Sequence, residues 1–183
     1  YPMGIHEIVF YLILLVTIRY IVKEVKTRSL RGVTKNFIFG TPREYTSDIK
    51  IFMFMDLISS TSYAEKLGHK KYSKFICDIY SEIDEYVLAT KGNIYQYVGD
   101  EVVIVWDIKD GIKKDNFLKL FLQFEQRLLE LKDYFNKTYE IFPQFKAGFH
   151  VGEVAIAEVG DILKREVAFH GDAVNTTARI CSL

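Results

Sequence analysis

The apolar run Ile49–Leu57 limits the folds open to this chain more than any other segment. It has the length of a strand, and it is apolar on both of the faces that alternate along a strand. Such a run is typical of a strand that is covered on both sides. We therefore expect a central strand in a layered domain. Hydrophobic residues make up 49% of the 183 residues, which is enough to fill a core and excludes global disorder.

The segments after this run predict a mixed fold. The run Ser59-Ser60-Thr61 offers hydroxyl N-caps for a helix, and Gly99-Asp100 is typical of a hairpin turn between two apolar strands. We predict, in order, a helix over about 70–89, strands at 94–98 and 102–106, a helix over about 116–135, a strand pair 145–151 and 154–159 turning at Gly152, a strand near 167–169, and a last helix starting at 171–172. This order predicts an α+β, ferredoxin-like (βαββαβ) fold, with two helical layers against a mainly antiparallel sheet.

The N-terminal segment is predicted to be the end of a transmembrane helix, over residues 1–24. Ile8–Ile18 is apolar apart from Thr17, and the chain after it is basic, at Lys23, Lys26, Arg28, Arg31 and Lys35. Basic residues directly after an apolar run favour the cytoplasmic side. A cleaved signal peptide would instead place the basic residues before the run. A buried soluble helix stays open, because the run alone is shorter than the ~20 residues that span a bilayer.

The remaining chain divides into a connector, 25–47, and a catalytic domain, 48–183. Gly32, Gly40 and Pro42 punctuate the connector and argue against one straight helix. Leu183 falls inside a predicted helix, so we expect a domain truncated at its C-terminus. The sequence thus predicts a protein of the cell membrane whose catalytic domain is cytoplasmic.

Charge and cysteine content narrow the function classes. The 24 Lys and Arg residues balance the 24 Asp and Glu residues, so no overall basic field exists to hold a nucleic acid, and we expect no such partner. Cys77 and Cys181 form no spaced pair. Reduced thiols in a cytosolic domain are the expected reading.

Asp56 is the first candidate for metal binding. It lies at the carboxyl end of the apolar run, where an unpaired carboxylate is costly to desolvate. Taken alone it is more typical of an ordinary strand-end aspartate. The start of a helix at Ser59, Ser60 and Thr61 follows closely, however, and helix N-termini bind phosphate through free N–H groups. A carboxylate before a phosphate cradle suits a metal–triphosphate ligand.

Asp100 is the second candidate. Gly-Asp is a common turn sequence, so an ordinary turn aspartate with no metal-binding role is a stronger explanation here than for Asp56. In a sheet of the predicted order, however, the hairpin lies next to the first strand. The two aspartates are then expected to hold one or two Mg²⁺ together with substrate phosphates, which is how Mg²⁺ is usually bound.

Asn175 and Arg179 form a third candidate element. They are four residues apart on the last predicted helix and therefore share a face. An amide suits a ribose and a guanidinium suits a phosphate. A solvent-facing polar stripe explains this pair equally well.

Four segments together resemble the class III adenylyl/guanylyl cyclases. They occur in the order and at the spacing of that family and cover most of residues 48–183. They are Phe54-Met-Asp-Leu-Ile-Ser-Ser-Thr61, Tyr95-Gln-Tyr-Val-Gly-Asp-Glu101, Gly148-Phe-His-Val-Gly-Glu-Val154 and Gly171-Asp-Ala-Val-Asn-Thr-Thr-Ala-Arg179. Any one of them is a weak signal, whereas four in order are specific.

The resemblance implies a role for each candidate. Asp56 and Asp100 bind two Mg²⁺ or Mn²⁺ ions, and Ser59–Thr61 holds the β- and γ-phosphates. Asn175 orients the ribose, and Arg179 stabilises charge on the α-phosphate during attack of the ribose 3′-oxygen. The resemblance also implies a head-to-tail homodimer, in which one subunit supplies the aspartates and the other supplies Asn175 and Arg179.

The purine-selecting positions depart from the family pattern. Adenylyl cyclases of this class usually have Lys, and guanylyl cyclases Glu, at the position of Gln96, and Ala168 stands where Asp or Thr, or Cys, is usual. A glutamine amide both donates and accepts hydrogen bonds, and alanine does neither. We therefore expect loose selection between ATP and GTP, with ATP slightly favoured.

Two other functions stay open. One is a non-catalytic cyclase-like domain that binds nucleotide or regulates a partner, although such domains usually lose one of the four site residues retained here. The other is a diguanylate cyclase, whose signature Val98-Gly-Asp-Glu-Val102 resembles in part. That family does not explain Asn175 and Arg179.

Overall fold

The structure is a computed structural model that describes Thr17, residues 45–161 and residues 164–183. Nearly all of these residues belong to one compact unit, Glu44–Leu183. Apart from Thr17, the predicted transmembrane end, 1–24, lies outside the described residues, as does most of the predicted connector, 25–47. Among the helices that the structure describes, none has the length and apolar character needed to cross a bilayer.

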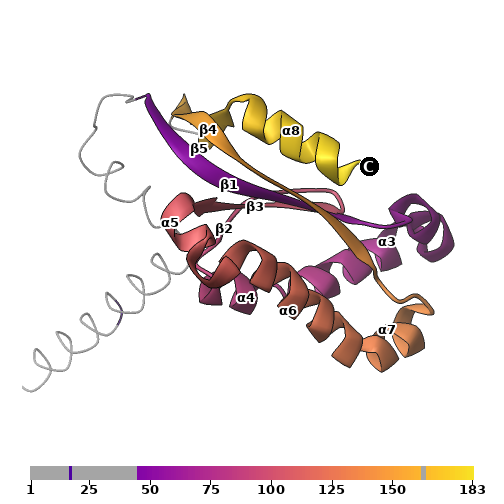
Figure 1. Cartoon of the computed structure of the whole chain (residues 1–183). Helices are drawn as coiled ribbons and strands as arrows, with labels where there is room; N and C mark the ends of the chain where they lie inside the picture. Colours follow the sequence, from indigo (N-terminus) through magenta and orange to yellow (C-terminus); the bar gives the residue numbers. More distant parts are fainter. Residues whose placement is uncertain (1–16, 18–44, 162–163) are drawn as a thin grey trace, which may run out of the picture. The chain divides into compact units, whose positions relative to one another are not determined.

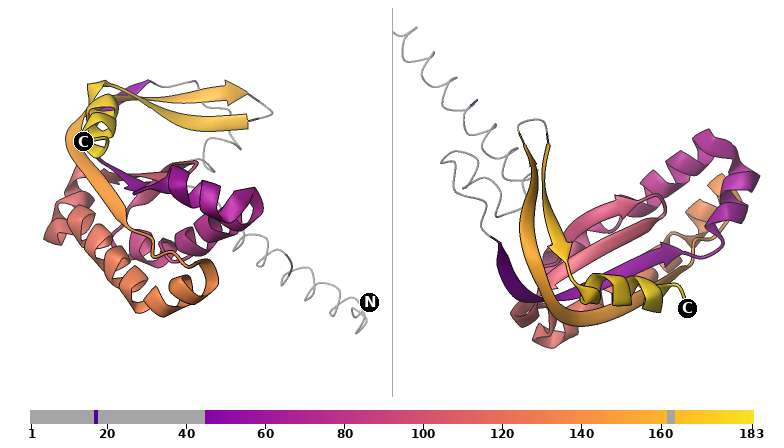
Figure 2. Two further views of the ribbon diagram at one scale, coloured as in Figure 1. Left: turned by 90° about the vertical axis from the view of Figure 1, so that its right-hand side faces the viewer. Right: turned by 90° about the horizontal axis from the view of Figure 1, so that it is seen from above.

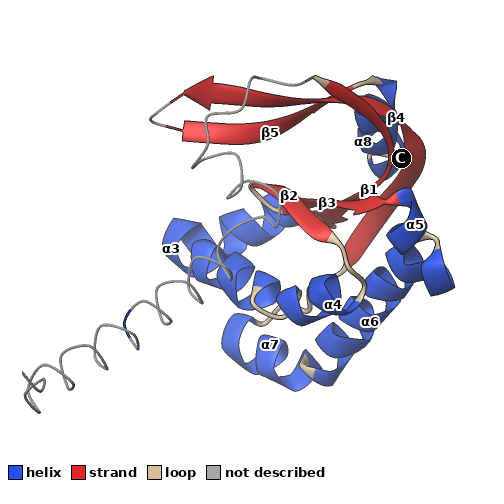
Figure 3. Cartoon of the chain, turned by 90° about the vertical axis from the view of Figure 1, so that its left-hand side faces the viewer, coloured by secondary structure: helices blue, strands red, loops and turns tan. Residues whose placement is uncertain are grey.

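A five-stranded antiparallel sheet forms the centre of the domain. Its strands are β1 (Thr46–Leu57), β2 (Asn93–Val98), β3 (Glu101–Asp107), β4 (Phe145–Asp161) and β5 (Lys164–His170). Their order is β2-β3-β1-β4-β5. The first four strands have the order and antiparallel pairing of the predicted ferredoxin-like βαββαβ fold, and β5 extends the sheet beyond β4. Figure 3 shows that the sheet is strongly curled.

Helices cover both faces of the sheet, as the apolar first strand predicts. The helices are α3 (Ser60–Tyr80), α4 (Asp84–Ala89), α5 (Ile108–Gly111), α6 (Asn116–Glu130), α7 (Lys132–Tyr139) and α8 (Asp172–Cys181), with a short 3₁₀ turn, η1, at Lys113–Asp115. The longer helices before β4 gather on one side, whereas α8 lies along β4 on the other (Figures 1 and 2).

Side chains of β1 point alternately to the two faces of the sheet, and the domain therefore has two separate cores. Met53 and Met55 face the larger core, which side chains of α3, α4, α6 and α7 complete. Phe52 and Phe54 face the smaller core, which Ala173 and Cys181 of α8 complete. All four of these β1 side chains are buried. Both faces of β1 are therefore apolar because both are covered, which is the physical reason for the unbroken run in the sequence.

The predicted helix boundaries are wrong in two places. The helix start expected at Ser59–Thr61 is confirmed, since α3 begins at Ser60, but α3 continues into the stretch expected over 70–89, which divides into α3 and α4. Gly68 has a positive φ of 69° and a non-helical conformation, so α3 bends there, which glycine permits without steric strain. The expected helix over 116–135 divides at Leu131 into α6 and α7.

The predicted turn at Gly152 is also wrong. β4 continues from Phe145 to Asp161 and pairs first with β1 and then with β5. Gly152 lies inside the strand, where an added Cβ would come within 2.8 Å of the Ala173 Cβ. This glycine therefore allows α8 to approach the strand closely rather than allowing the chain to turn.

Candidate active site

Asp56 lies at the end of β1, in register with Glu101 of β3 and Lys146 of β4. Side chains alternate along a strand, so Asp56 shares the α8 side of the sheet with Phe52 and Phe54. The Lys146 Nζ is 3.7 Å from the Asp56 Oδ2, and the Asp56 side chain is 31% exposed. Asp56 is thus a partly buried carboxylate at the open end of the central strand.

Asp100 lies in the turn between β2 and β3, at the same end of the sheet. Gly99 adopts a positive φ of 65°, which closes the hairpin between Val98 and Glu101. The Tyr80 hydroxyl, at the end of α3, donates a hydrogen bond of 2.6 Å to the Asp100 carbonyl oxygen. The turn is therefore held by a helix as well as by its own strands.

The strand pairing brings Asp56 near Asp100, because Asp56 pairs with Glu101, the residue directly after Asp100. Burial raises the pKa of Asp56, the negative charge of Asp100 raises it further, and Lys146 offsets only part of this. Burial likewise raises the pKa of the Glu101 carboxyl, and Asp56 and Asp100 add to the effect. Three carboxylates thus repel one another at one end of the sheet.

This acidic cluster fits a divalent cation. Hard carboxylate oxygens are the ligands that Mg²⁺ prefers, and a cation would relieve the repulsion that raises the pKa values of Asp56 and Glu101. The three carboxylates do not form a set of three metal ligands, and the described residues contain no other group of three or more His, Cys, Asp or Glu side chains that could hold a metal ion. Mg²⁺ is commonly bound through one or two carboxylates, with substrate phosphates as further ligands. Asp56 and Asp100 are the pair that would hold it.

The N-terminus of α3 follows Asp56 directly. Ser59 is the N-cap residue, has a positive φ of 63° and makes no side-chain capping bond, and the first turn contains no acidic residue. The first N–H groups of a helix lack partners within the helix. Burial raises the pKa of Tyr72 on this helix, the charges of Asp100 and Asp56 add to the rise, and the nearby Ser60 hydroxyl acts in the opposite direction. The predicted phosphate cradle and the acidic cluster therefore share one neighbourhood.

Asn175 and Arg179 lie on α8, on the side turned away from the sheet. The opposite side of this helix, with Ala173, Thr177 and Cys181, is buried. The Arg179 side chain is 71% exposed, with its guanidinium 3.4 Å from Asp172.

The close contact of α8 with β4 fixes this orientation. An added Cβ at Gly148 would lie 2.5 Å from the Cys181 backbone nitrogen. Among the described residues, no hydrogen bond or ion pair within the chain joins Asn175 or Arg179 to Asp56 or Asp100; Arg179 bonds to Asp172 and Thr176 of its own helix. The outward side of α8 is instead open to another molecule.

The two predicted purine-selecting residues lie on the outer strands. Gln96 is exposed on β2, beside an irregularity in the pairing with β3. Ala168 of β5 pairs with Ala157 of β4. The residues next to them in the sequence are in contact: the ring centroids of Tyr95 and Phe169 are 5.0 Å apart. The curl of the sheet visible in Figure 3 brings these outer strands toward each other.

Sequence reasoning missed Lys146, Glu101 and Tyr80. Each reaches the site only through pairing or packing: Lys146 and Glu101 flank Asp56 in the sheet, and Tyr80 arrives from the far end of α3. One sequence signal could have found Lys146. It lies two residues before Gly148, the first residue of a family segment, and therefore on the same side of the predicted strand. In the sequence, Tyr80 is indistinguishable from the other apolar positions of an amphipathic helix.

Comparison with known proteins bears on the family of the domain. Residues 43–183 match the family model of the adenylate and guanylate cyclase catalytic domain. The chain is 29% identical over 150 residues to adenylate cyclase 2 of Rhizobium meliloti (strain 1021), covering 82% of this chain and 41% of the relative. It is 25% identical over 134 residues to adenylate cyclase 1 of the same organism, covering 70% of this chain and 20% of the relative. The chain thus spans less than half the length of these relatives.

Solved structures show the same fold. A bacterial light-regulated adenylyl cyclase superposes with a TM-score of 0.74 at 23% identity, over 93% of this chain and 51% of that one. The guanylyl cyclase Cya2 superposes with a TM-score of 0.64 at 17% identity, over 75% of this chain and 71% of that one. From the family match over residues 43–183, the chain belongs to the adenylate and guanylate cyclase catalytic-domain family.

Proposed function

We propose that the domain converts a purine nucleoside triphosphate into its 3′,5′-cyclic monophosphate and pyrophosphate. The observation that carries this proposal is the proximity of Asp56, at the end of β1, to Asp100, in the turn before β3, with the N-terminus of α3 directly after Asp56. A metal–triphosphate ligand needs an acidic pair and a donor cradle side by side. The family match and the adenylate cyclase relatives support the same reaction.

In the proposed reaction the ribose 3′-oxygen attacks the α-phosphorus. The bond from 3′-oxygen to phosphorus forms, the bond from the α-phosphorus to the pyrophosphate oxygen breaks, and the 3′-hydroxyl proton leaves to solvent. Asp56 and Asp100 hold two Mg²⁺ or Mn²⁺ ions, which when bound neutralise charge on the reacting oxygens. Ser59, Ser60 and Thr61 hold the β- and γ-phosphates at the start of α3.

Lys146 has a proposed part in phosphate binding. Its ammonium group lies 3.7 Å from the Asp56 carboxylate. With a divalent cation held at Asp56, the Lys146 ammonium group would be available to a phosphate oxygen.

A second subunit completes the proposed site. Asn175 orients the ribose and Arg179 neutralises the α-phosphoryl oxygens, both from the outward side of the partner's α8. The exposure of Arg179 and the burial of the opposite side of α8 support this arrangement. A two-fold homodimer then has two equivalent sites. We also propose attachment to the cell membrane through residues 1–24, with the catalytic domain in the cytoplasm, which fractionation of cells expressing the complete protein would test.

Base selection is proposed to be loose, with ATP slightly preferred over GTP. The exposed Gln96 amide can pair with either purine by turning over, and Ala168 offers no side-chain hydrogen bond. The kcat/KM values for ATP and GTP should differ by far less than ~10⁴, the ratio reached when a site is built to hydrogen-bond one substrate. A larger ratio would contradict loose selection.

The test is incubation of the complete protein with ATP or GTP and Mn²⁺, followed by identification of the product by mass. Cyclic mononucleotide and pyrophosphate are expected from the wild type and not from a folded Asp56→Ala variant. A cyclic dinucleotide would identify a diguanylate cyclase instead. Nucleotide binding without any product would identify a regulatory domain.

A further inference from the structure

Tyr80 connects α3 to the turn that carries Asp100. Its hydroxyl donates a hydrogen bond of 2.6 Å to the Asp100 carbonyl oxygen. This carbonyl is bonded to the Asp100 Cα, which carries the carboxylate side chain. The bond therefore restrains the backbone from which the carboxylate projects. Burial raises the pKa of Tyr80, so its phenol stays protonated and remains a donor at neutral pH.

The surroundings of Tyr80 hold its ring in one place. The side chain is 9% exposed. Its ring lies 4.8 Å from that of Tyr97 on β2 and 6.4 Å from that of Phe145 on β4. A buried ring between two strands has little freedom to swing away from the carbonyl. The hydroxyl is thus a fixed donor rather than a chance surface contact.

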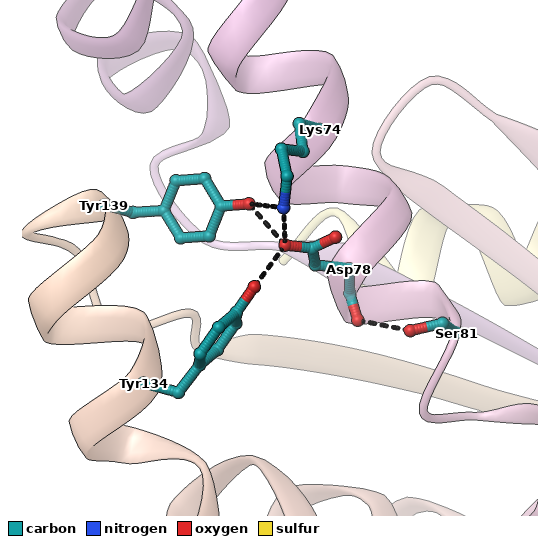
Figure 4. Close-up of polar contacts among 5 residues, drawn as sticks. All are labelled: Lys74, Asp78, Ser81, Tyr134 and Tyr139. Carbon is teal, nitrogen blue, oxygen red and sulfur yellow. Dashed lines mark hydrogen bonds and ion pairs between the residues drawn. The ribbon is translucent and has the colours of Figure 1, made fainter.

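The helix end that carries Tyr80 is itself anchored. Asp78, two residues earlier, accepts hydrogen bonds from Lys74, Tyr134 and Tyr139 (Figure 4). The tyrosines belong to α7, so these bonds join the two helices. The Ser81 hydroxyl then donates to the Asp78 carbonyl oxygen and closes the helix end. A rigid helix end is the support that a metal-binding residue on a two-residue turn requires.

We propose that Tyr80 is a positioning residue for the metal site, and that its hydroxyl holds the Asp100 carboxylate in place for a divalent cation. The inference rests on the proposed function, since it takes Asp100 to be a metal ligand. Tyr80 does not touch the cation in this proposal; it acts through the Asp100 backbone. Loss of the hydroxyl frees the turn and weakens cation binding, while the fold and the nucleotide contacts remain.

The test compares Tyr80→Phe with Tyr139→Phe in the complete protein. Each change removes one phenolic donor and keeps the ring, but Tyr139 donates to Asp78, away from the acidic cluster. Mn²⁺ alone is titrated and followed by electron paramagnetic resonance, and thermal unfolding is measured in parallel. We expect Mn²⁺ to bind Tyr80→Phe about three- to tenfold more weakly than wild type, the effect of one lost hydrogen bond. Tyr139→Phe is expected to lose stability but keep the wild-type Mn²⁺ affinity, because Lys74 and Tyr134 still hold Asp78 and with it the helix end.

Kinetics provide a second readout. In Tyr80→Phe the Mn²⁺ concentration for half-maximal activity should rise by the same factor, whereas the KM for nucleotide at saturating Mn²⁺ should stay within about twofold of wild type. Unchanged Mn²⁺ affinity in Tyr80→Phe overturns the inference and leaves the proposed function standing. Equal weakening in both variants also overturns it, since the effect is then one of general stability. A wild type that neither binds Mn²⁺ nor forms product overturns both proposals.

Discussion

At the scale of single residues, Asp56 is held in a position that folding alone does not favour. Burial and the charge of Asp100 raise its pKa, so its ionised form destabilises the folded state. The destabilisation is present at neutral pH, and it disappears as pH falls through the raised pKa, because the folded state then takes up the proton first. Under the proposed function, the acidic cluster gives up some stability in exchange for cation binding.

Asp56→Asn should consequently be at least as stable as wild type at pH 7 without metal, yet inactive. Thermal unfolding should show this difference at pH 7, and the difference should shrink as pH falls through the raised pKa of the wild-type carboxyl. Added Mn²⁺ should raise the Tm of wild type more than that of the variant, because only the wild type binds it well. A variant markedly less stable than wild type at pH 7 would argue that the Lys146 ion pair dominates instead.

Lys146 supports a second prediction at this scale. Lys146→Gln removes the ammonium group that lies beside Asp56. If that group contacts phosphate in the complex, kcat/KM should fall about 10- to 100-fold, as expected for loss of a charge-assisted hydrogen bond of ~1.5–3 kcal/mol. Steady-state kinetics with Mn²⁺ and ATP measure this. Lys66→Gln, which alters an exposed lysine paired with Glu140, is the matched control and should be kinetically silent.

At the scale of elements, two glycines of β4 determine how closely α8 packs. Gly148→Ala would place a methyl group 2.5 Å from the backbone of Cys181, which must displace the helix. We expect a loss of about 1–3 kcal/mol in the free energy of unfolding, the usual effect of overpacking. Gly152→Ala should cost less, because its new methyl meets the Ala173 side chain, at 2.8 Å. Denaturant unfolding of the two variants would test this ranking, and the reverse order would contradict it.

The contact between α3 and α7 gives a pH-dependent prediction. Burial opposes ionisation of Asp78, but hydrogen bonds from Lys74, Tyr134 and Tyr139 outweigh it and lower its pKa (Figure 4). The stabilisation is therefore present above the unfolded-state pKa and is lost as pH falls through the lowered one. Asp78→Asn should lower the free energy of unfolding by about 1–2 kcal/mol at pH 7. Unfolding curves at decreasing pH should converge with those of wild type, and a constant difference would contradict the charge-based explanation.

At the scale of the whole molecule, the position of α8 predicts complementation between subunits. Asp56→Ala and Arg179→Ala should each be inactive alone. In a head-to-tail dimer, a mixed pair has one site with both residues intact and one with neither. Equal mixing with full subunit exchange should restore about one quarter of the wild-type activity, because about half of the dimers are mixed. No recovery, despite mixed dimers by mass spectrometry, would place the aspartates and Arg179 in the same chain's site.

Much of this architecture could be predicted from sequence. The unbroken apolar run of β1, the turn at Gly99-Asp100 and the amphipathic helix patterns are local features, and local features determine element type and order. Four motifs in order then indicated the family. The errors were at boundaries: Gly68 and Leu131 do not look like helix breaks, and Gly152 looks like a turn although its role is to admit α8.

The sequence by itself determined which elements form, their order and the residue types that carry the proposed chemistry. Only the tertiary structure decided which side chains meet. The pairing register places Lys146 and Glu101 beside Asp56, and helix packing places the Tyr80 hydroxyl on the Asp100 carbonyl. The physical reason is range: periodicity and turn chemistry act between near neighbours, whereas register and packing depend on the free energy of the whole assembled core.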